Sequence, residues 1–269
     1  MQKKKIIVII LTVLIFLSAS ILGVSAVYRV ADVTVNAPVV SLEAQAEAVE
    51  LQQRLQKAYE NDSTIFANDE KAKTIVSEFP YFRLKSFKKD FPDRIVVELQ
   101  EDEEVYAVPV DGANNSYYIL NGEGTVLGVR NNISNRSDGA ENIFITGDSR
   151  FSVTGEKGKP LSGDDCLQTL FAFCMRVDIR LEGIRRNVVK IEVQRPTVDS
   201  TETTFVLFMR EGVKIYVRNP SMSTLEKAEK AMDEYFALDD SKRLNGFLAV
   251  YDGENGVLCQ YYYDESVLG

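Results

Sequence analysis

The chain has 269 residues, of which 45% are hydrophobic and 26% are charged, and its formal net charge at pH 7 is −9. This composition suffices for packed domains and excludes a disordered chain, and the acidic balance argues against nucleic acid as a partner. The absence of histidine excludes Ser-His-Asp and Cys-His nucleophile systems and every histidine-ligated metal site.

The N-terminus joins a short basic segment to a long apolar one. Residues 1–5 contain Lys3, Lys4 and Lys5, and residues 6–27 contain no charged side chain. As a helix this run would reach roughly 33 Å, enough to cross a hydrocarbon core of about 30 Å. The sequence therefore predicts a cytoplasmic tail at 1–5, a single transmembrane helix at 6–27 and a type II orientation with the bulk of the chain outside the cell membrane. The alternative is a signal peptide cleaved after Ala26.

Residues 28–104 are predicted to form one small domain. A strand is expected at 29–35, and two amphipathic helices follow, which begin near Ser41 and at Asn68 or Asp69. Alternating side chains then predict two strands joined by a turn. These last elements are the strands 82–87 and 95–100 and the turn Phe91-Pro92-Asp93.

This succession of helix, basic strand, Phe-Pro turn and apolar strand resembles the POTRA domain of DivIB/FtsQ-type bacterial cell-division proteins. The positions that carry the resemblance are Pro80-Tyr81, Phe82, Pro92, Ile95, Val97, Glu101, Gly124 and Val126. The sequence departs from the family pattern at Asp102, where arginine is common. The resemblance implies a β-α-α-β-β domain at 28–104 followed by a C-terminal β domain.

Residues 105–263 are expected to form this second, extracytoplasmic domain, a mixed α+β domain dominated by an antiparallel sheet. One helix is expected after Ser162 or Asp164, and a capping box at 223–226 predicts another. The turn-rich window 131–142 is predicted to be a joint. The strands are expected at 105–110, 117–120, 143–147, 189–193, 205–209, 213–217, 247–251 and 257–263, with a C-terminal tail at 264–269.

Cysteines and clustered acids are the remaining candidates for chemistry. Cys166 and Cys174 lie about 12 Å apart along one predicted helix, too far for a disulfide. With Cys259 they are interpreted as small buried hydrophobes. The acids at 101–104 are expected to form a solvated linker face or a weak cation contact, although composition does not exclude a carboxylate-pair hydrolase. We predict no catalytic, cofactor-binding or metal-binding residue, and no enzymatic activity.

A basic set surrounds the predicted hairpin of the small domain. Its functional interpretation is contact with anionic lipid head groups or with an acidic partner near the membrane. The alternative is an ordinary solvated strand edge that is protected by lysines. The set comprises Arg83, Lys85, Lys88, Lys89 and Arg94.

The last predicted strand, 257–263, has neither lysine nor proline, and no strand pattern follows it. We therefore expect it at a sheet edge, where unpaired backbone groups can add a partner's strand. The alternatives are a central position in the sheet or a cover formed by 264–269. The candidate partner-binding residues are Val257, Leu258, Gln260, Tyr261, Tyr262 and Tyr263.

The resemblance implies a non-enzymatic, membrane-anchored scaffold of the divisome. Such a protein localises to the division septum, where its C-terminal β domain binds and stabilises other single-pass division proteins with extracytoplasmic coiled coils. No cofactor and no small-molecule substrate are implied. The alternative function is a secreted or anchored cell-wall-associated hydrolase or binding protein that carries a POTRA-like module.

Overall fold

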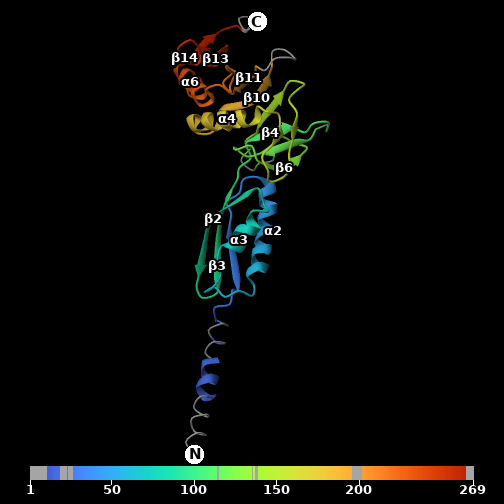
Figure 1. The fold of residues 1–269 in the computed structure, drawn as a ribbon, viewed down its shortest axis with the longest axis vertical. Helices are drawn as coiled ribbons and strands as arrows, with labels where there is room; N and C mark the ends of the chain where they lie inside the picture. The colour runs from blue at the N-terminus through green and yellow to red at the C-terminus, as the bar shows by residue number, and fades with distance from the viewer. Residues whose placement is uncertain are drawn as a thin grey trace, which may run out of the picture. The chain divides into compact units, whose positions relative to one another are not determined.

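The computed structural model describes residues 11–18, 23, 27–113, 115–134, 136, 139–195 and 202–264. Internal contacts divide the chain into two compact units, one formed by Met1–Val39 and Glu43–Asp102 and the other by Val40–Leu42 and Glu103–Gly269. Both units combine helices with strands, and the second contains a large sheet (Figure 1). The protein is therefore mixed α+β.

The transmembrane helix predicted at 6–27 is not found. Among the described residues, no helix is both long and apolar enough to cross a membrane. Residues 11–18 are helical. The remainder of the predicted segment, apart from residues 23 and 27, lies outside the described residues, as does the candidate cleavage site at 24–26.

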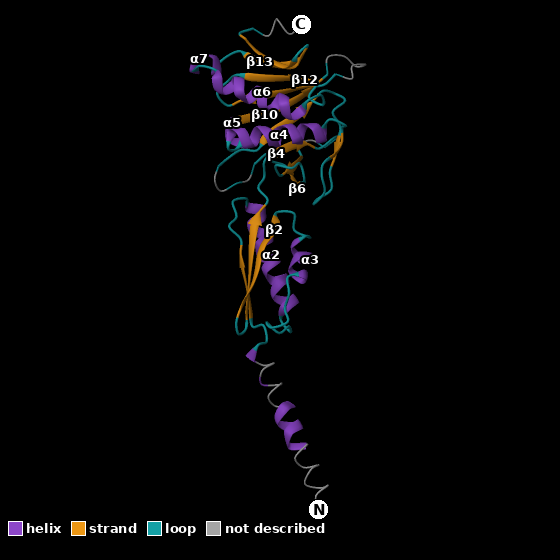
Figure 2. Ribbon diagram, turned by 60° about the vertical axis from the view of Figure 1, so that its left-hand side comes forward, coloured by secondary structure: helices purple, strands orange, loops and turns teal. Residues whose placement is uncertain are grey.

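The first unit has the expected order of strand, helix, helix, strand and strand. Its three-stranded sheet places β3 in the centre, parallel to β1 and antiparallel to β2. Both helices lie on one face of this sheet (Figure 2). The elements are β1 (Asp32–Asn36), α2 (Leu42–Tyr59), α3 (Glu70–Val76), β2 (Phe82–Asp90) and β3 (Arg94–Glu101).

Tyr59 joins the two helices of this unit. Its buried hydroxyl donates to the carbonyl of Asn68 at 2.6 Å and accepts from the N–H of Ala72 at 3.1 Å. Asn68 in turn accepts from the N–H of Glu70 with its side-chain oxygen at 3.2 Å, whereas Asp69 forms no side-chain cap. Of the two predicted caps for α3, Asn68 is therefore the one whose side chain accepts from a backbone N–H of the helix, whereas the carboxylate of Asp69 pairs with Lys73 at 2.6 Å.

The second unit is built on a nine-stranded sheet with the order β14-β13-β12-β11-β10-β7-β4-β5-β6. Most neighbours are antiparallel, but β7 is parallel to both β4 and β10, and β12 is parallel to β13. These strands are β4 (Tyr106–Pro109), β5 (Tyr117–Leu120), β6 (Val126–Arg130), β7 (Ile143–Gly147), β10 (Val188–Gln194), β11 (Thr204–Met209), β12 (Lys214–Arg218), β13 (Phe247–Gly253) and β14 (Gly256–Tyr262).

The remaining elements of the second unit are short, except for two helices. Both helices, α4 and α6, pack on one face of the sheet (Figure 2) and bury an apolar core with it. Within this core the rings of Phe173 and Phe205 meet edge to face at 6.2 Å. The elements are β8 (Val153–Thr154), β9 (Ser162–Gly163), α4 (Leu167–Leu181), α5 (Ile184–Asn187), α6 (Thr224–Ala237) and α7 (Asp240–Arg243).

The turn-rich window 131–142 connects β6 to β7. Because β7 pairs with β4, the sheet continues across the window, and the division into compact units does not fall there. Asn142, at the end of the window, is buried and donates its amide to the carbonyl of Ile133 at 2.8 Å. The described part of the window therefore packs as a connection within one unit.

The capping box predicted at 223–226 is wrong. Ser223 adopts a left-handed conformation with φ of 57° and makes no side-chain cap. Its carbonyl accepts from the N–H of Lys227 at 2.9 Å, and Thr224 donates its hydroxyl to the carbonyl of Pro220 at 2.7 Å. The helix start is thus stabilised by backbone geometry and by Thr224.

Candidate partner-binding edge

Strand β14 is the edge of the large sheet. It pairs with β13 on one side, and no strand of the described chain lies on its other side. The predicted edge position is therefore confirmed for the described residues, and the central alternative is wrong. Residues 265–269, which were the possible cover, lie outside the described residues.

The register shows which backbone groups of β14 point outward. Gly253 pairs with Gly256 across a two-residue loop, and Val257 donates its N–H to the side chain of Glu226 at 3.5 Å. Val257 therefore directs its N–H away from β13. Because hydrogen-bonding direction alternates along an antiparallel strand, Cys259 and Tyr261 direct their backbone groups to the same outer side.

The side chains of β14 divide into two alternating sets. Val257, Cys259 and Tyr261 pack against the core of the second unit. On the opposite face, Tyr262 stacks on Phe247 with ring centroids 5.2 Å apart. Leu258 and Gln260 are on this second face and are exposed, as is Tyr263 just beyond the strand. The edge thus offers outward backbone groups with an aromatic side chain beside them.

The face of the sheet that carries Tyr262 has a small aromatic cluster of its own. Tyr216 and Phe247 meet edge to face at 5.2 Å, and the ammonium of Lys214 lies 5.2 Å from the ring of Phe208. Val206 and Ala249 are buried in the same cluster. Aromatic side chains of β12, β13 and β14 therefore form one cluster on this face.

The basic set of the first unit is largely matched by acids. Arg83 forms a two-nitrogen contact with Asp102 at 3.0 and 2.9 Å, and Lys88 pairs with Glu98 at 2.6 Å. Hydrogen bonds from Lys88, and then from Ser86, lower the pKa of Glu98. Local pairing of this kind favours the interpretation as a protected strand edge.

The remaining members of the basic set also lie on this hairpin. Arg94 contacts Asp32 at 3.3 Å and Asp90 at 3.7 Å. Lys89 donates to the carbonyl of Ile65 at 2.7 Å, and Lys85 lies on β2 itself. The positive charge of Lys85, like that of Lys88, lowers the pKa of Glu98. The structure therefore brings the five side chains onto one hairpin. Several carboxylates lie beside them and form ion pairs with three of the five.

The acids at 101–104 form a solvated face only in part, because Glu103 is exposed but two of the others are buried. Glu101 is 7% exposed and Glu104 is fully buried. Glu104 accepts from both terminal nitrogens of Arg130, at 2.8 and 2.6 Å, and from the amide of Asn142 at 3.0 Å. The predicted solvated face is therefore wrong for Glu104, because its partner cation is supplied from 26 residues away.

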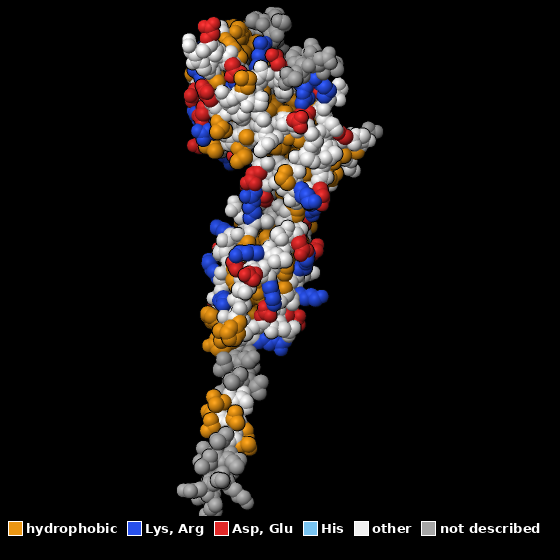
Figure 3. All heavy atoms as spheres, viewed as in Figure 1, with side chains coloured by type: hydrophobic (Ala, Val, Ile, Leu, Met, Phe, Trp, Pro, Cys, Tyr) orange, Lys and Arg blue, Asp and Glu red, His pale blue; other side chains and the backbone are white. Residues whose placement is uncertain are grey.

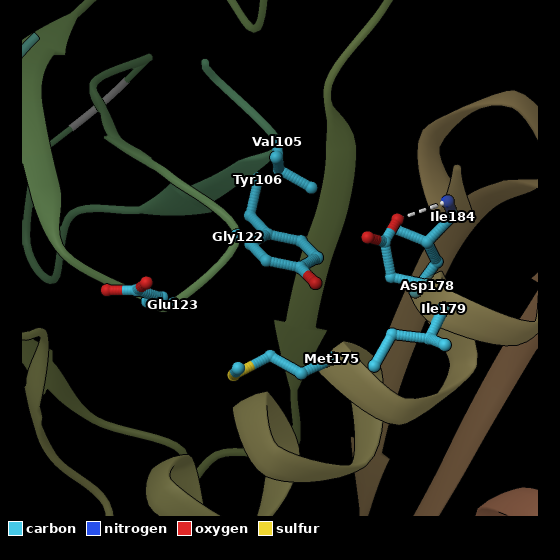
Figure 4. A pocket seen from close by; sticks show the side chains of 8 residues that line it. All are labelled: Val105, Tyr106, Gly122, Glu123, Met175, Asp178, Ile179 and Ile184. Atoms are coloured by element: carbon cyan, nitrogen blue, oxygen red, sulfur yellow. Dashed lines mark hydrogen bonds between the residues drawn. The ribbon is translucent and has the colours of Figure 1, made fainter. Parts of the chain in front are cut away.

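A hollow of about 210 Å³ lies between α4, α5 and the β4 region (Figure 4). Tyr106 and Ile184 form part of its lining, with the exposed Met175 at its rim. Its acid Asp178 accepts from the N–H of Ile184 at 2.6 Å. This carboxylate therefore has a structural role at the start of α5, where it fixes the helix.

The cysteines are free and largely unreactive. Burial raises the pKa of Cys174 to about 12, and it likewise raises the pKa of Cys259 to about 12. Burial, together with Asp164 beside it, raises the pKa of Cys166. Since the thiolate is the reactive form, these thiols are poor nucleophiles at neutral pH. Within the described parts of the chain, no group of three or more potential ligands is placed to hold a metal ion.

Comparison of the chain with known proteins adds no assignment. No family model matches the sequence, and no curated protein matches it.

Proposed function

We propose that the protein is a non-enzymatic, membrane-attached scaffold of the bacterial division site. Its β14 edge binds an extended segment of another septal division protein, one that is itself single-pass and carries an extracytoplasmic coiled coil. The observation that carries this proposal is the outward backbone of Cys259 and Tyr261 on a strand without lysine or proline. Natural edge strands are usually blunted unless they pair with another chain.

Strand addition accounts for both affinity and selectivity at this edge. Backbone hydrogen bonds to Cys259 and Tyr261 provide affinity that depends little on the partner's sequence. The exposed Leu258 and the stacked Tyr262 contact alternate side chains of the added strand, and such contacts select the partner. In this arrangement the second unit lies on the extracytoplasmic side of the cell membrane.

Removing one outward donor tests the edge directly. Proline at Cys259 deletes the outward N–H while leaving the backbone pairs of Ala249 with Gln260 and of Phe247 with Tyr262 in place. Proline is tolerated where the N–H of an edge strand faces away from the sheet. We expect the C259P variant to lose affinity for its septal partner by about tenfold or more, measured by titration of the purified proteins.

The matched control is C259A, which keeps the backbone N–H and loses only the thiol. We expect C259A to bind as the wild type does. Proline at Gln260 or Tyr262 is less informative, because these residues pair with β13. Removing their backbone N–H groups would disrupt the pairing of β14 with β13. Equal binding by C259P and C259A, with both variants folded by circular dichroism, would place the binding surface elsewhere.

The cellular role is tested by localisation. We expect a fluorescent fusion to the full chain to concentrate at the septum of dividing cells, and the C259P fusion to show reduced septal signal at equal abundance. A uniform envelope signal from the wild-type fusion would contradict the division assignment.

A further inference from the structure

Three segments of the first unit meet at the end where the chain enters it. The N–H of Thr64 donates to the carbonyl of Tyr28 at 2.7 Å, and its hydroxyl donates to the carbonyls of both Tyr28 and Pro92. Val30 donates to the carbonyl of Asp62 at 2.9 Å. Thr64 itself is fully buried. The entry residues, the α2–α3 connection and the β2–β3 turn are therefore held together as one preformed surface, which we call the entry tip.

The entry tip presents large apolar side chains to solvent. Phe66 is 83% exposed, Phe91 is 57% exposed and Ile65 is 40% exposed. Tyr28 lies against Phe91, with ring centroids 6.0 Å apart in an edge arrangement, and Val27 is also exposed. Figure 3 shows hydrophobic side chains gathered at this end of the unit. Scattered exposed apolar residues are ordinary, but a contiguous group on a rigid support marks a contact surface.

The sequence that leads into the tip indicates which surface it contacts. Residues 6–27 carry no charged side chain, and the exposed Val27 and the tip residue Tyr28 follow without an intervening linker. The membrane attachment of the proposed function, made through the part of the chain that precedes Tyr28, places the entry tip close to the lipid surface.

The polar groups of the tip suit a lipid–water interface. Lys89 donates to the carbonyl of Ile65 at 2.7 Å, which places an ammonium beside the apolar side chains. Arg29 contacts the carbonyl of Glu60 at 3.3 Å and the side chain of Asn61 at 2.5 Å. Aromatic rings with lysine or arginine at their border are the composition found at membrane interfaces, where the cation reaches head groups.

We propose that the entry tip inserts Phe66, Phe91 and Ile65 into the head-group region of the bilayer. The insertion fixes the orientation of the first unit on the membrane surface. This inference rests on the membrane attachment in the proposed function, and it adds a second contact with the same membrane. The basic hairpin takes no part in it beyond Lys89.

The chain has no tryptophan, so one substitution provides a unique fluorophore. The full-length F66W variant is reconstituted into vesicles of phosphatidylcholine and phosphatidylglycerol, with or without bromine on the acyl chains near the head group. We expect a blue-shifted emission that the brominated lipid quenches about twofold or more, as for an indole at interfacial depth. F91W, on the other loop of the tip, is expected to behave in the same way.

The matched control is F236W, because Phe236 is a 45% exposed phenylalanine on α6 of the second unit. Its emission is expected to be unchanged by bromine. Flotation of the same vesicle samples measures membrane attachment of the protein independently of its fluorescence. Flotation with no quenching of F66W or F91W would overturn the entry-tip proposal alone. Failure to float would overturn membrane attachment, and the tip proposal with it. A blue shift of F66W without quenching would show a protein contact and also overturn the proposal.

Discussion

Replacing Glu104 by alanine is expected to lower the free energy of unfolding of the second unit by about 3–5 kcal/mol. The carboxylate of Glu104 is fully buried, and its partner Arg130 is 12% exposed, with N–O distances of 2.8 and 2.6 Å. Without the carboxylate, the Arg130 guanidinium loses the anion that balances its charge, and the acceptors that remain include the neutral carbonyls of Asn132 and Ile133. Removing one member of a buried pair leaves an uncompensated charge, which costs more than the pair contributes.

Urea denaturation followed by circular dichroism measures this effect, with separate transitions allowed for the two units. The control is E156A, because the pair of Glu156 with Lys159 is exposed and we expect no change in its unfolding midpoint. A second variant, E104M with R130M, replaces the pair by apolar side chains and should recover much of the loss. An E104A midpoint equal to that of E156A would contradict this account of the site.

The importance of Glu104 was not accessible from local sequence. It stands in a run of acids after a strand, which is the pattern of a solvated turn. Its partners Arg130 and Asn142 lie 26 and 38 residues away, and they approach it only once β4, β6 and β7 join in one sheet. The window 131–142 was likewise predicted to be a joint from its turn residues. Turn chemistry marks where the chain bends, but it does not distinguish a linker from a connection within a sheet.

Periodicity was informative where a single face of an element is buried. In the first unit, alternating side chains predicted β2 and β3, and the i, i+3, i+4 pattern predicted the two helices. For β14 the edge position was predicted from the lack of any strand pattern after it, but the sequence did not show which set of alternating side chains faces the core. The packing of Val257, Cys259 and Tyr261 on the core settles that point. This core includes residues of α6, which contacts β14 although it precedes that strand in the chain.

Lys227 is the other residue whose role depends on distant partners. The sequence places it on α6, one residue after the predicted capping box, where a lysine is ordinarily solvated. In the structure it is fully buried. Its ammonium donates to the carbonyls of Arg218 and Asn219, both at 2.8 Å, and to the carboxylate of Asp252 at 2.7 Å. One side chain therefore connects α6 with the end of β12 and with the β13–β14 hairpin.

We expect the substitution Lys227→Ala to lower the free energy of unfolding of the second unit by about 3 kcal/mol, because two backbone carbonyls and a half-buried carboxylate lose their shared donor. The loss of stability should be largest near the β13–β14 hairpin, which contains Asp252. Hydrogen exchange is therefore expected to accelerate more in β13 than in β4, which lies on the far side of β7 in the same sheet. Such loosening also predicts weaker partner binding at β14.

The matched control is K230A on the same helix. Lys230 is partly exposed and pairs with Glu234 at 2.8 Å within α6, so its removal should leave the unfolding midpoint and the exchange of β13 unchanged. Urea denaturation and exchange mass spectrometry on the full chain measure both quantities. If K227A unfolds at the same urea concentration as K230A, the buried ammonium is not what holds the hairpin to α6, and the packing of Val257, Cys259 and Tyr261 on the core must do so instead.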